Sequence, residues 1–134
     1  MRKCLVSVSV ALALAAGCSS IPSLGPTPAD EGVVIFVNAA FAGPSQALNV
    51  DVPDLGKVRG ACSSGAEGET PTWEDCVSSV KVLPGWTAIL YRDSNYKGAS
   101  VTVTADTPNL RDVTGPCSND SFNDCVSSIR VSRK

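Results

Sequence analysis

Two short segments of the chain repeat the same order of oxygen-bearing side chains. Residues 74–79 read Glu-Asp-Cys-Val-Ser-Ser, and residues 123–128 read Asn-Asp-Cys-Val-Ser-Ser. Carboxylate, amide and hydroxyl oxygens are the ligands that hard cations take in proteins. The same residue types also cap turns, where Asp, Asn and Ser are common. These two hexapeptides therefore indicate either a cation site or a pair of capped turns.

The composition argues against an enzyme. The chain has no histidine, which removes Ser–His and Cys–His nucleophiles and zinc sites built on imidazole. Paired carboxylates could still act as acid and base, but the acidic residues stand in turn-like segments rather than as an isolated pair. We therefore expect a non-enzymatic protein.

The two hexapeptides belong to a tandem duplication. Residues 36–62 match residues 91–117 at a constant offset of 55, and after a six-residue insertion in the first copy the match resumes at an offset of 49. The repeat places Trp73 on Phe122 and brings the two hexapeptides onto each other. Self-similarity of this kind predicts two copies of one supersecondary unit, over residues 32–83 and 86–132.

Each copy has an apolar pattern of period two, which is typical of β-strands. The predicted strands cover residues 33–36, 47–52 and 78–82 in the first copy and residues 88–91, 101–104 and 127–131 in the second. No segment shows a sustained helical stripe, and β-branched residues are frequent. The ordered part is of ordinary size for one core. We predict an all-β fold, an eight-stranded β-sandwich in a single domain over residues 32–134.

The N-terminus has the pattern of a signal peptide. Arg2 and Lys3 precede an apolar run of 13 residues, which is shorter than the roughly 20 that a membrane-spanning helix needs. The run ends at Ala-Ala-Gly-Cys18, which resembles a lipoprotein signal-peptidase site and predicts a signal peptide over residues 1–17 and a lipid on Cys18. The alternative is cleavage after residues 13–15, an Ala-x-Ala site, which leaves Cys18 as a free thiol.

Residues 18–31 contain three prolines and no hydrophobic period, so we expect a lipidated cysteine followed by a flexible tether. Ser follows Cys18, which resembles the outer-membrane sorting pattern. The expected location is the bacterial cell envelope, as an outer-membrane lipoprotein that faces the periplasm or the cell surface. Without Arg2 and Lys3 the chain has nine basic and 13 acidic residues, and this acidic balance excludes nucleic acid as a partner.

Four cysteines remain in the ordered part of the chain, and in an exported protein such an even number predicts disulfides. They are Cys62, Cys76, Cys117 and Cys125. Four cysteines allow three pairings, among which spacing alone does not choose. Because each copy carries its own pair at equivalent places, the duplication favours Cys62–Cys76 and Cys117–Cys125 over the crossed pairings.

An aromatic-x4-aromatic-x-Gly pattern at residues 36–43 and again at residues 91–98 resembles the Greek-key signature of the βγ-crystallin family. Ser45 and Ser100 follow these patterns two places later. The resemblance, which covers the whole ordered domain, implies a microbial βγ-crystallin domain built from two Greek-key motifs. It also implies that the aromatic pair clamps a folded hairpin and that the serine caps it.

The two hexapeptides are similar to the calcium motif of that family, which has two Asn or Asp residues, two variable residues, then Ser or Thr and Ser. The resemblance implies that calcium ions are held jointly by both motifs, with a backbone carbonyl from each hairpin. The implied site residues are Glu74, Asp75, Ser78, Asn123, Asp124, Ser127, Val37 and Arg92. Glu74 stands where Asn or Asp is usual, so we expect residues 123–128 to be the more dependable half.

These observations lead to one functional hypothesis and one alternative. The hypothesis is a calcium-binding, non-enzymatic, βγ-crystallin-like lipoprotein module of the cell envelope, with calcium ions and, through the lipid anchor, a membrane as its partners. The sequence does not indicate which protein, if any, is a partner. The alternative is a secreted protease inhibitor or toxin-like interaction protein of related fold that does not bind calcium.

Overall fold

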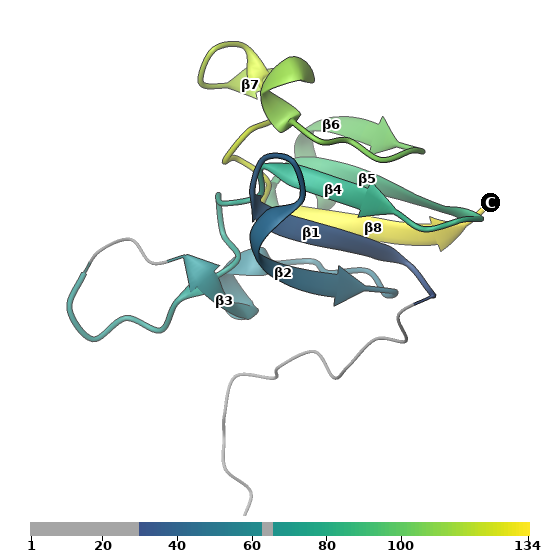
Figure 1. The fold of residues 1–134 in the computed structure, drawn as a ribbon. Helices are drawn as coiled ribbons and strands as arrows, with labels where there is room; N and C mark the ends of the chain where they lie inside the picture. The colour runs from purple at the N-terminus through teal and green to yellow at the C-terminus, as the bar shows by residue number, and fades with distance from the viewer. Residues whose placement is uncertain (1–29, 63–65) are drawn as a thin grey trace, which may run out of the picture.

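The computed structural model describes residues 30–62 and 66–134, and the predicted signal peptide, Cys18 and most of the predicted tether lie outside the described residues. Two three-stranded antiparallel sheets make up the domain (Figure 1). The first has the order β2 (Ala42–Leu48), β1 (Val33–Asn38), β4 (Ser79–Val82), and the second has the order β6 (Lys97–Val103), β5 (Trp86–Asp93), β8 (Ser128–Arg133). Two short strands, β3 (Arg59–Cys62) and β7 (Thr114–Cys117), lie outside these sheets. The eight strands confirm the predicted all-β sandwich.

One residue of each copy also pairs with an edge strand in the sheet of the other copy. Val52 of the first copy bridges Ile129 in β8, with N–O distances of 2.8 and 2.9 Å. Thr107 of the second copy bridges Val80 in β4, with N–O distances of 2.8 and 3.0 Å. This reciprocal exchange ties the copies into one domain. The strand predicted over residues 47–52 is wrong beyond Leu48, because β2 ends there and the chain then turns toward the other sheet.

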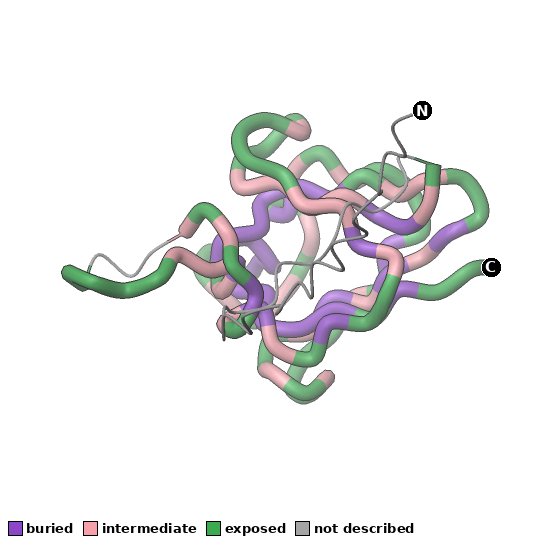
Figure 2. The backbone as a smooth tube through the Cα atoms, turned by 90° about the horizontal axis from the view of Figure 1, so that it is seen from below, coloured by how far each residue is buried: buried purple, intermediate pink, exposed green. Residues whose placement is uncertain are grey.

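The core lies between the two sheets, where alternate residues of each strand face inward. Val33 and Ile35 of β1 and Ala88 and Leu90 of β5 are fully buried, in the period-two order that the sequence predicts. Figure 2 shows buried segments running through the middle of the molecule, with exposed loops around them. Burial of a valine, isoleucine or leucine side chain contributes about 2 kcal/mol, so apolar packing between the copies holds the sandwich together.

Two short 3-10 turns form backbone hydrogen bonds to the hexapeptides. They are η1 (Leu55–Lys57) and η3 (Leu110–Asp112); a third, η2 (Ser94–Tyr96), lies in the second hairpin. Leu55 and Leu110 are fully buried. The Leu55 N–H donates to Ser127 O at 2.8 Å, and the Leu110 N–H donates to Ser78 O at 2.9 Å. Each turn therefore fixes the hexapeptide of the other copy.

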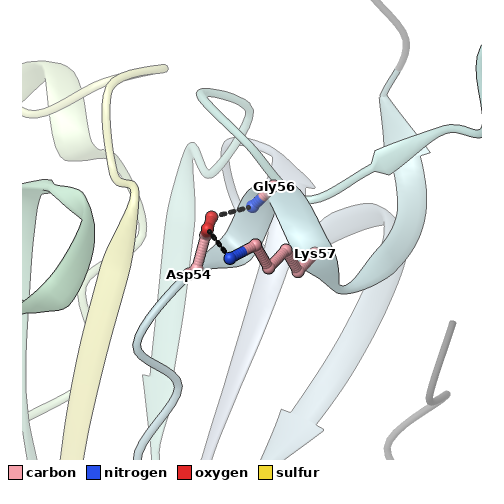
Figure 3. Close-up of polar contacts among 3 residues, drawn as sticks. All are labelled: Asp54, Gly56 and Lys57. Atoms are coloured by element: carbon pink, nitrogen blue, oxygen red, sulfur yellow. Dashed lines mark hydrogen bonds and ion pairs between the residues drawn. The ribbon is translucent and has the colours of Figure 1, made fainter.

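Side chains cap the N-terminal ends of η1 and η3. Asp54 accepts a hydrogen bond from the Gly56 N–H at 3.0 Å and lies 3.4 Å from the Lys57 ammonium (Figure 3). Asn109 caps η3 in the same way, accepting from the Arg111 N–H at 3.1 Å. Within residues 30–62 and 66–134, none of the helical segments has the length and apolarity to cross a membrane.

Candidate functional site

The two hexapeptides lie against each other across the junction of the copies. The Asp124 N–H donates to Val77 O at 3.1 Å, and the Asp75 N–H donates to Val126 O at 3.4 Å. Asp75 and Asp124 both have left-handed backbone conformations, with φ of 49° and 53°. Asp enters this region more readily than most residues with a Cβ. The same local geometry therefore appears twice, related by the repeat.

One site combines the acidic end of the second hexapeptide with the serine of the first. Ser78 Oγ donates to Asp124 Oδ1 at 3.0 Å, and Asn123 Nδ2 donates to Asp124 Oδ2 at 2.5 Å. These groups border an open hollow of about 660 Å³ that Val37 also lines. We call Val37, Ser78, Asn123 and Asp124 the Asn123 site.

The other site combines the acidic end of the first hexapeptide with the serine of the second. Ser127 Oγ donates to Glu74 Oε1 at 2.6 Å and lies 3.5 Å from Asp75 Oδ1. These groups border a hollow of about 470 Å³ that Arg92 and Asp93 also line. We call Glu74, Asp75, Arg92 and Ser127 the Glu74 site. Each hexapeptide thus supplies a hydroxyl to one site and its acids or amides to the other, and Asp75 borders both hollows.

Val37 and Arg92 are placed by equivalent irregularities in β1 and β5. The pairing of β1 with β2 shifts register between Phe36 and Asn38, and the pairing of β5 with β6 shifts between Tyr91 and Asp93. A shift of this kind leaves the intervening residue outside the ladder. In the two hairpins, the backbone of Val37 and that of Arg92 therefore lie outside the regular strand pairing, beside the two sites.

The aromatic pairs clamp the hairpins, as the family resemblance implies. The ring centroids of Phe36 and Phe41 lie 5.7 Å apart, and those of Tyr91 and Tyr96 are equally far apart, both in edge-on arrangement. Centroid separations in this range are favourable for aromatic rings. The hairpins themselves turn through positive φ at Phe41 and Tyr96.

The serines that cap the hairpins are not the ones that the resemblance suggests. Ser79 Oγ donates to Asn38 O at 2.6 Å and accepts from the Phe41 N–H at 3.1 Å. Ser128 Oγ makes the equivalent bonds in the second copy, to Asp93 O and from the Tyr96 N–H. Ser45 and Ser100 are exposed on the edge strands instead. The cap therefore comes from the last residue of each hexapeptide, which links hairpin and site.

The surroundings of Glu74 disfavour its ionised form. Burial raises its pKa above the ordinary 4.5, the Ser127 hydroxyl lowers it, and the neighbouring Asp75 and Asp54 carboxylates raise it further. Its Oε2 atom is buried and has no hydrogen-bond partner among the described residues. The nearby Gly56 N–H donates to Asp54, and the same backbone group also lowers the pKa of Glu74 slightly. A buried acceptor without a donor is unfavourable, so this oxygen would gain from a cation.

Asp75 is perturbed in the same direction for a similar reason. Burial raises its pKa above the ordinary 3.8, while the Ser127 hydroxyl and the Arg92 guanidinium lower it and the Asp124 carboxylate raises it. Arg92 therefore supplies part of the positive charge in the Glu74 site. In the described ranges 30–62 and 66–134, no three acidic, cysteine or histidine side chains gather as a metal cluster. A calcium site here would combine carboxylates with amide, hydroxyl and carbonyl oxygens, all of which suit that ion.

The structure contains the disulfide pairing that the duplication favours. Cys62 bonds to Cys76 and Cys117 to Cys125, with Cα–Cα distances of 6.2 and 6.3 Å. Each bridge joins the third residue of a hexapeptide to the end of β3 or β7. The disulfides therefore fix the hexapeptides from within their own copies.

Several residues around the sites were not singled out from the sequence. Asn38, Asn109 and Arg111 line the hollow of the Asn123 site. The repeat carries a signal for the first two, because Asn38 matches Asp93 and Asn109 matches Asp54 at the offset of 55. Polar residues that short turns require recur at equivalent places in both copies. Arg111 matches a glycine, so the repeat carries no signal for it.

Comparison with protein families gives a match over residues 32–103 to the family described as peptidase inhibitor family I36. Development-specific protein S of Myxococcus xanthus is 35% identical over 100 residues, which cover 74% of this chain and 47% of that protein. The chain thus spans about half the length of this relative.

Solved structures give the same picture. The N-terminal domain of protein S aligns with a TM-score of 0.54 and 28% identity, covering 76% of this chain and 96% of that domain. A βγ-crystallin domain from Flavobacterium johnsoniae aligns with a TM-score of 0.54 and 28% identity, covering 75% and 93% of the two chains. A structure described under the evolution of the eye-lens βγ-crystallin domain fold aligns with a TM-score of 0.58 and 25% identity, covering 84% and 95%.

Proposed function

The chain belongs to peptidase inhibitor family I36 and forms a βγ-crystallin domain, and from this premise we propose that it is a non-enzymatic calcium-binding module of the bacterial cell envelope. The observation that carries this proposal is the reciprocal contact between the hexapeptides. Ser78 reaches Asp124 at 3.0 Å, and Ser127 reaches Glu74 at 2.6 Å. Each hollow consequently gathers oxygen atoms from both copies at one place.

The donor set of each site fits a calcium ion. Calcium takes six to eight oxygen ligands, and waters complete the set where the protein supplies fewer. In the Asn123 site we assign the ligand role to side chains of Asn123, Asp124 and Ser78 and to the backbone of Val37. In the Glu74 site we assign it to side chains of Glu74, Asp75 and Ser127 and to the backbone of Arg92. A bound ion supplies positive charge to carboxylates that burial now disfavours.

The two sites are not equivalent in charge. The Arg92 guanidinium acts on Asp75 and already lowers its pKa, so a cation gains less there. We therefore propose that the Asn123 site is the tighter one.

Thermal unfolding in calcium and in chelator tests the proposal. A ligand that binds only the folded state raises Tm, by an amount that corresponds to about 2.7 kcal/mol at 100 times Kd. Ser78→Ala removes the hydroxyl of the Asn123 site, and Ser127→Ala removes that of the Glu74 site. We expect Ser78→Ala to reduce the calcium-dependent shift more than Ser127→Ala does. Equal Tm values with calcium and chelator in the unaltered protein would refute calcium binding.

We further propose that Cys18 carries a lipid that anchors this module to a membrane. The support is the sequence around Cys18 and the beginning of β1 at Val33, which leaves a spacer between anchor and domain. Radiolabelled palmitate fed to cells should be incorporated into the protein and not into Cys18→Ala. Incorporation that is equal in both would remove the proposal.

Peptidase inhibition is a second candidate, favoured by the family match over residues 32–103. Incubation of the oxidised protein with a panel of secreted metallo- and serine peptidases tests it. Stoichiometric loss of activity of one peptidase would support inhibition, and full activity of every member of the panel would discard it.

A further inference from the structure

A disulfide forms part of the wall of each candidate calcium site. Cys62 and Cys76 line the hollow of the Asn123 site, and Cys117 and Cys125 line the hollow of the Glu74 site. Each disulfide comes from the copy that supplies the hydroxyl of that site. In the oxidised protein, the wall of each hollow therefore contains one covalent bridge.

The same cysteines also hold the backbone of the ion-binding loops. Cys76 follows Asp75, whose φ is 49°, and precedes Val77, which is fully buried and whose carbonyl accepts the Asp124 N–H at 3.1 Å. Cys76 is itself buried. A loop held in a left-handed conformation at a non-glycine residue depends on surrounding constraints. The covalent link from β3 to Cys76 is one such constraint.

The second copy repeats this arrangement with a shorter link. Cys125 lies between Asp124, whose φ is 53°, and the fully buried Val126, whose carbonyl accepts the Asp75 N–H at 3.4 Å. Cys117 and Cys125 are eight residues apart in sequence, against 14 for the first pair. Both disulfides thus act on the aspartate of one site and on the wall of the other.

We propose that the two disulfides and the two calcium sites are thermodynamically coupled, so that the protein binds calcium fully only in its oxidised state; this rests on the proposed function. A dithiol reductant breaks each S–S bond, delivers two electrons and two protons, and leaves two cysteine thiols and an oxidised, cyclic form of itself. Freed from β3 and β7, residues 74–79 and 123–128 lose the constraint that orders their aspartates. Calcium affinity falls as a result.

Coupling of this kind is reciprocal. If oxidation tightens calcium binding by a given factor, calcium disfavours reduction of the disulfides by the same factor. We expect a factor of about 10, which for a two-electron couple corresponds to a shift of about 30 mV in reduction potential. The device would restrict calcium binding to oxidising compartments, where disulfides persist.

Two measurements on the full chain test the coupling. In the first, the wild-type protein is equilibrated in buffers with increasing ratios of reduced to oxidised dithiothreitol, and free thiols are counted with and without millimolar calcium. Calcium is expected to raise the ratio at which half of the protein disulfides are reduced about tenfold. Magnesium at the same concentration controls for ionic strength. In the second, calcium affinity is measured for Cys117→Ser/Cys125→Ser, whose fold is checked by circular dichroism, and is expected to be about tenfold weaker.

The outcomes separate the two proposals. Calcium binding to the oxidised wild type with a dithiothreitol midpoint that calcium leaves unchanged would overturn the coupling alone. Unchanged calcium affinity in a folded Cys117→Ser/Cys125→Ser protein would overturn it too. Absence of calcium binding by the oxidised wild type would overturn the proposed function and the coupling with it. Should the double variant unfold, the midpoint measurement on the wild type decides by itself.

Discussion

Replacement of Glu74 by glutamine should have opposite effects on stability with and without calcium. Burial disfavours the ionised carboxylate of Glu74, and its Oε2 atom has no hydrogen-bond partner among the described residues. In Glu74→Gln the charge is gone, and the amide Oε1 can still accept from Ser127 Oγ, which lies 2.6 Å from Oε1 in the wild type. The substitution therefore stabilises the calcium-free protein. In the calcium-bound protein it removes an anionic ligand and is destabilising.

The magnitude follows from the two affected contacts. A charged group buried without a partner costs more than the ~1–3 kcal/mol of a neutral polar group, so the neutral amide of glutamine relieves the excess at the Oε2 position; a neutral acceptor in place of a charged one weakens the Ser127 hydrogen bond by ~1 kcal/mol. The net gain without calcium is about 1 kcal/mol, or roughly 4–8 °C in Tm for a domain of this size. At 100 times Kd, one lost calcium site removes about 2.7 kcal/mol. The stability order of wild type and variant should therefore reverse in saturating calcium.

The pH dependence provides an independent check on the same residue. The folded-state pKa of Glu74 is raised above its ordinary 4.5, so the folded protein holds this proton more tightly than the unfolded chain does. Stability of the calcium-free wild type should rise as pH falls through the raised pKa toward 4.5. Glu74→Gln should lack this increment, although the similar contribution of Asp75 remains.

The assay is thermal unfolding in chelator and in calcium, followed by circular dichroism. Glu67→Gln is the matched control, since it removes the same charge at an exposed position of the first copy. It should change Tm little in either condition. If Glu74→Gln lowers Tm in chelator, or if its calcium-dependent shift equals that of the wild type, the assigned role of Glu74 is wrong.

Three further substitutions test the fold that positions the sites. Ser79→Ala removes two hydrogen bonds of the first hairpin, to Asn38 O and from the Phe41 N–H, and should lower the free energy of unfolding by about 2 kcal/mol in denaturant titration; an unchanged midpoint would disprove the capping role. Gly32→Ala places a Cβ in overlap with the backbone carbonyl of Leu48 at a φ of 87°, whereas Gly68→Ala, at a φ of 83°, meets no atom within 4 Å, so only the first should exceed the ~1–2 kcal/mol of backbone strain; equal losses would contradict this. Leu90→Ala empties a fully buried position between the sheets and should cost about 2–5 kcal/mol by the same titration, and a loss below 1 kcal/mol would argue against a shared core.

The tandem repeat made most of the fold predictable. Period-two patterns and equivalent cysteine pairs imply two similar β units, which the structure contains with both disulfides in place. The exchange of Val52 and Thr107 between the sheets was not predictable from these patterns, because the alternation of residues 47–52 continues unbroken through the turn after Leu48. A local pattern reports which residues are apolar, and only the tertiary arrangement decides which sheet they join.

The sites were predictable in their composition and less so in their assembly. The hexapeptide repeat identified the oxygen-bearing residues, and the structure joins Ser78 with Asp124 and Ser127 with Glu74 across the copies. The sequence predicted that residues 123–128 form the more dependable half. In the structure, Asn123 and Asp124 form a site together with Ser78 of the other hexapeptide. Capping of the hairpin by Ser79 depends on a contact over 38 residues, which spacing along the chain does not reveal.

Calorimetric titration of calcium into the oxidised, metal-stripped protein tests the central claim most directly. We predict saturable binding of two calcium ions, with the weaker event abolished in Ser127→Ala and the tighter one retained. Absence of heat and of any spectral change at millimolar calcium would contradict the claim, and would leave the two hexapeptides as capped turns that join the halves of a structural domain.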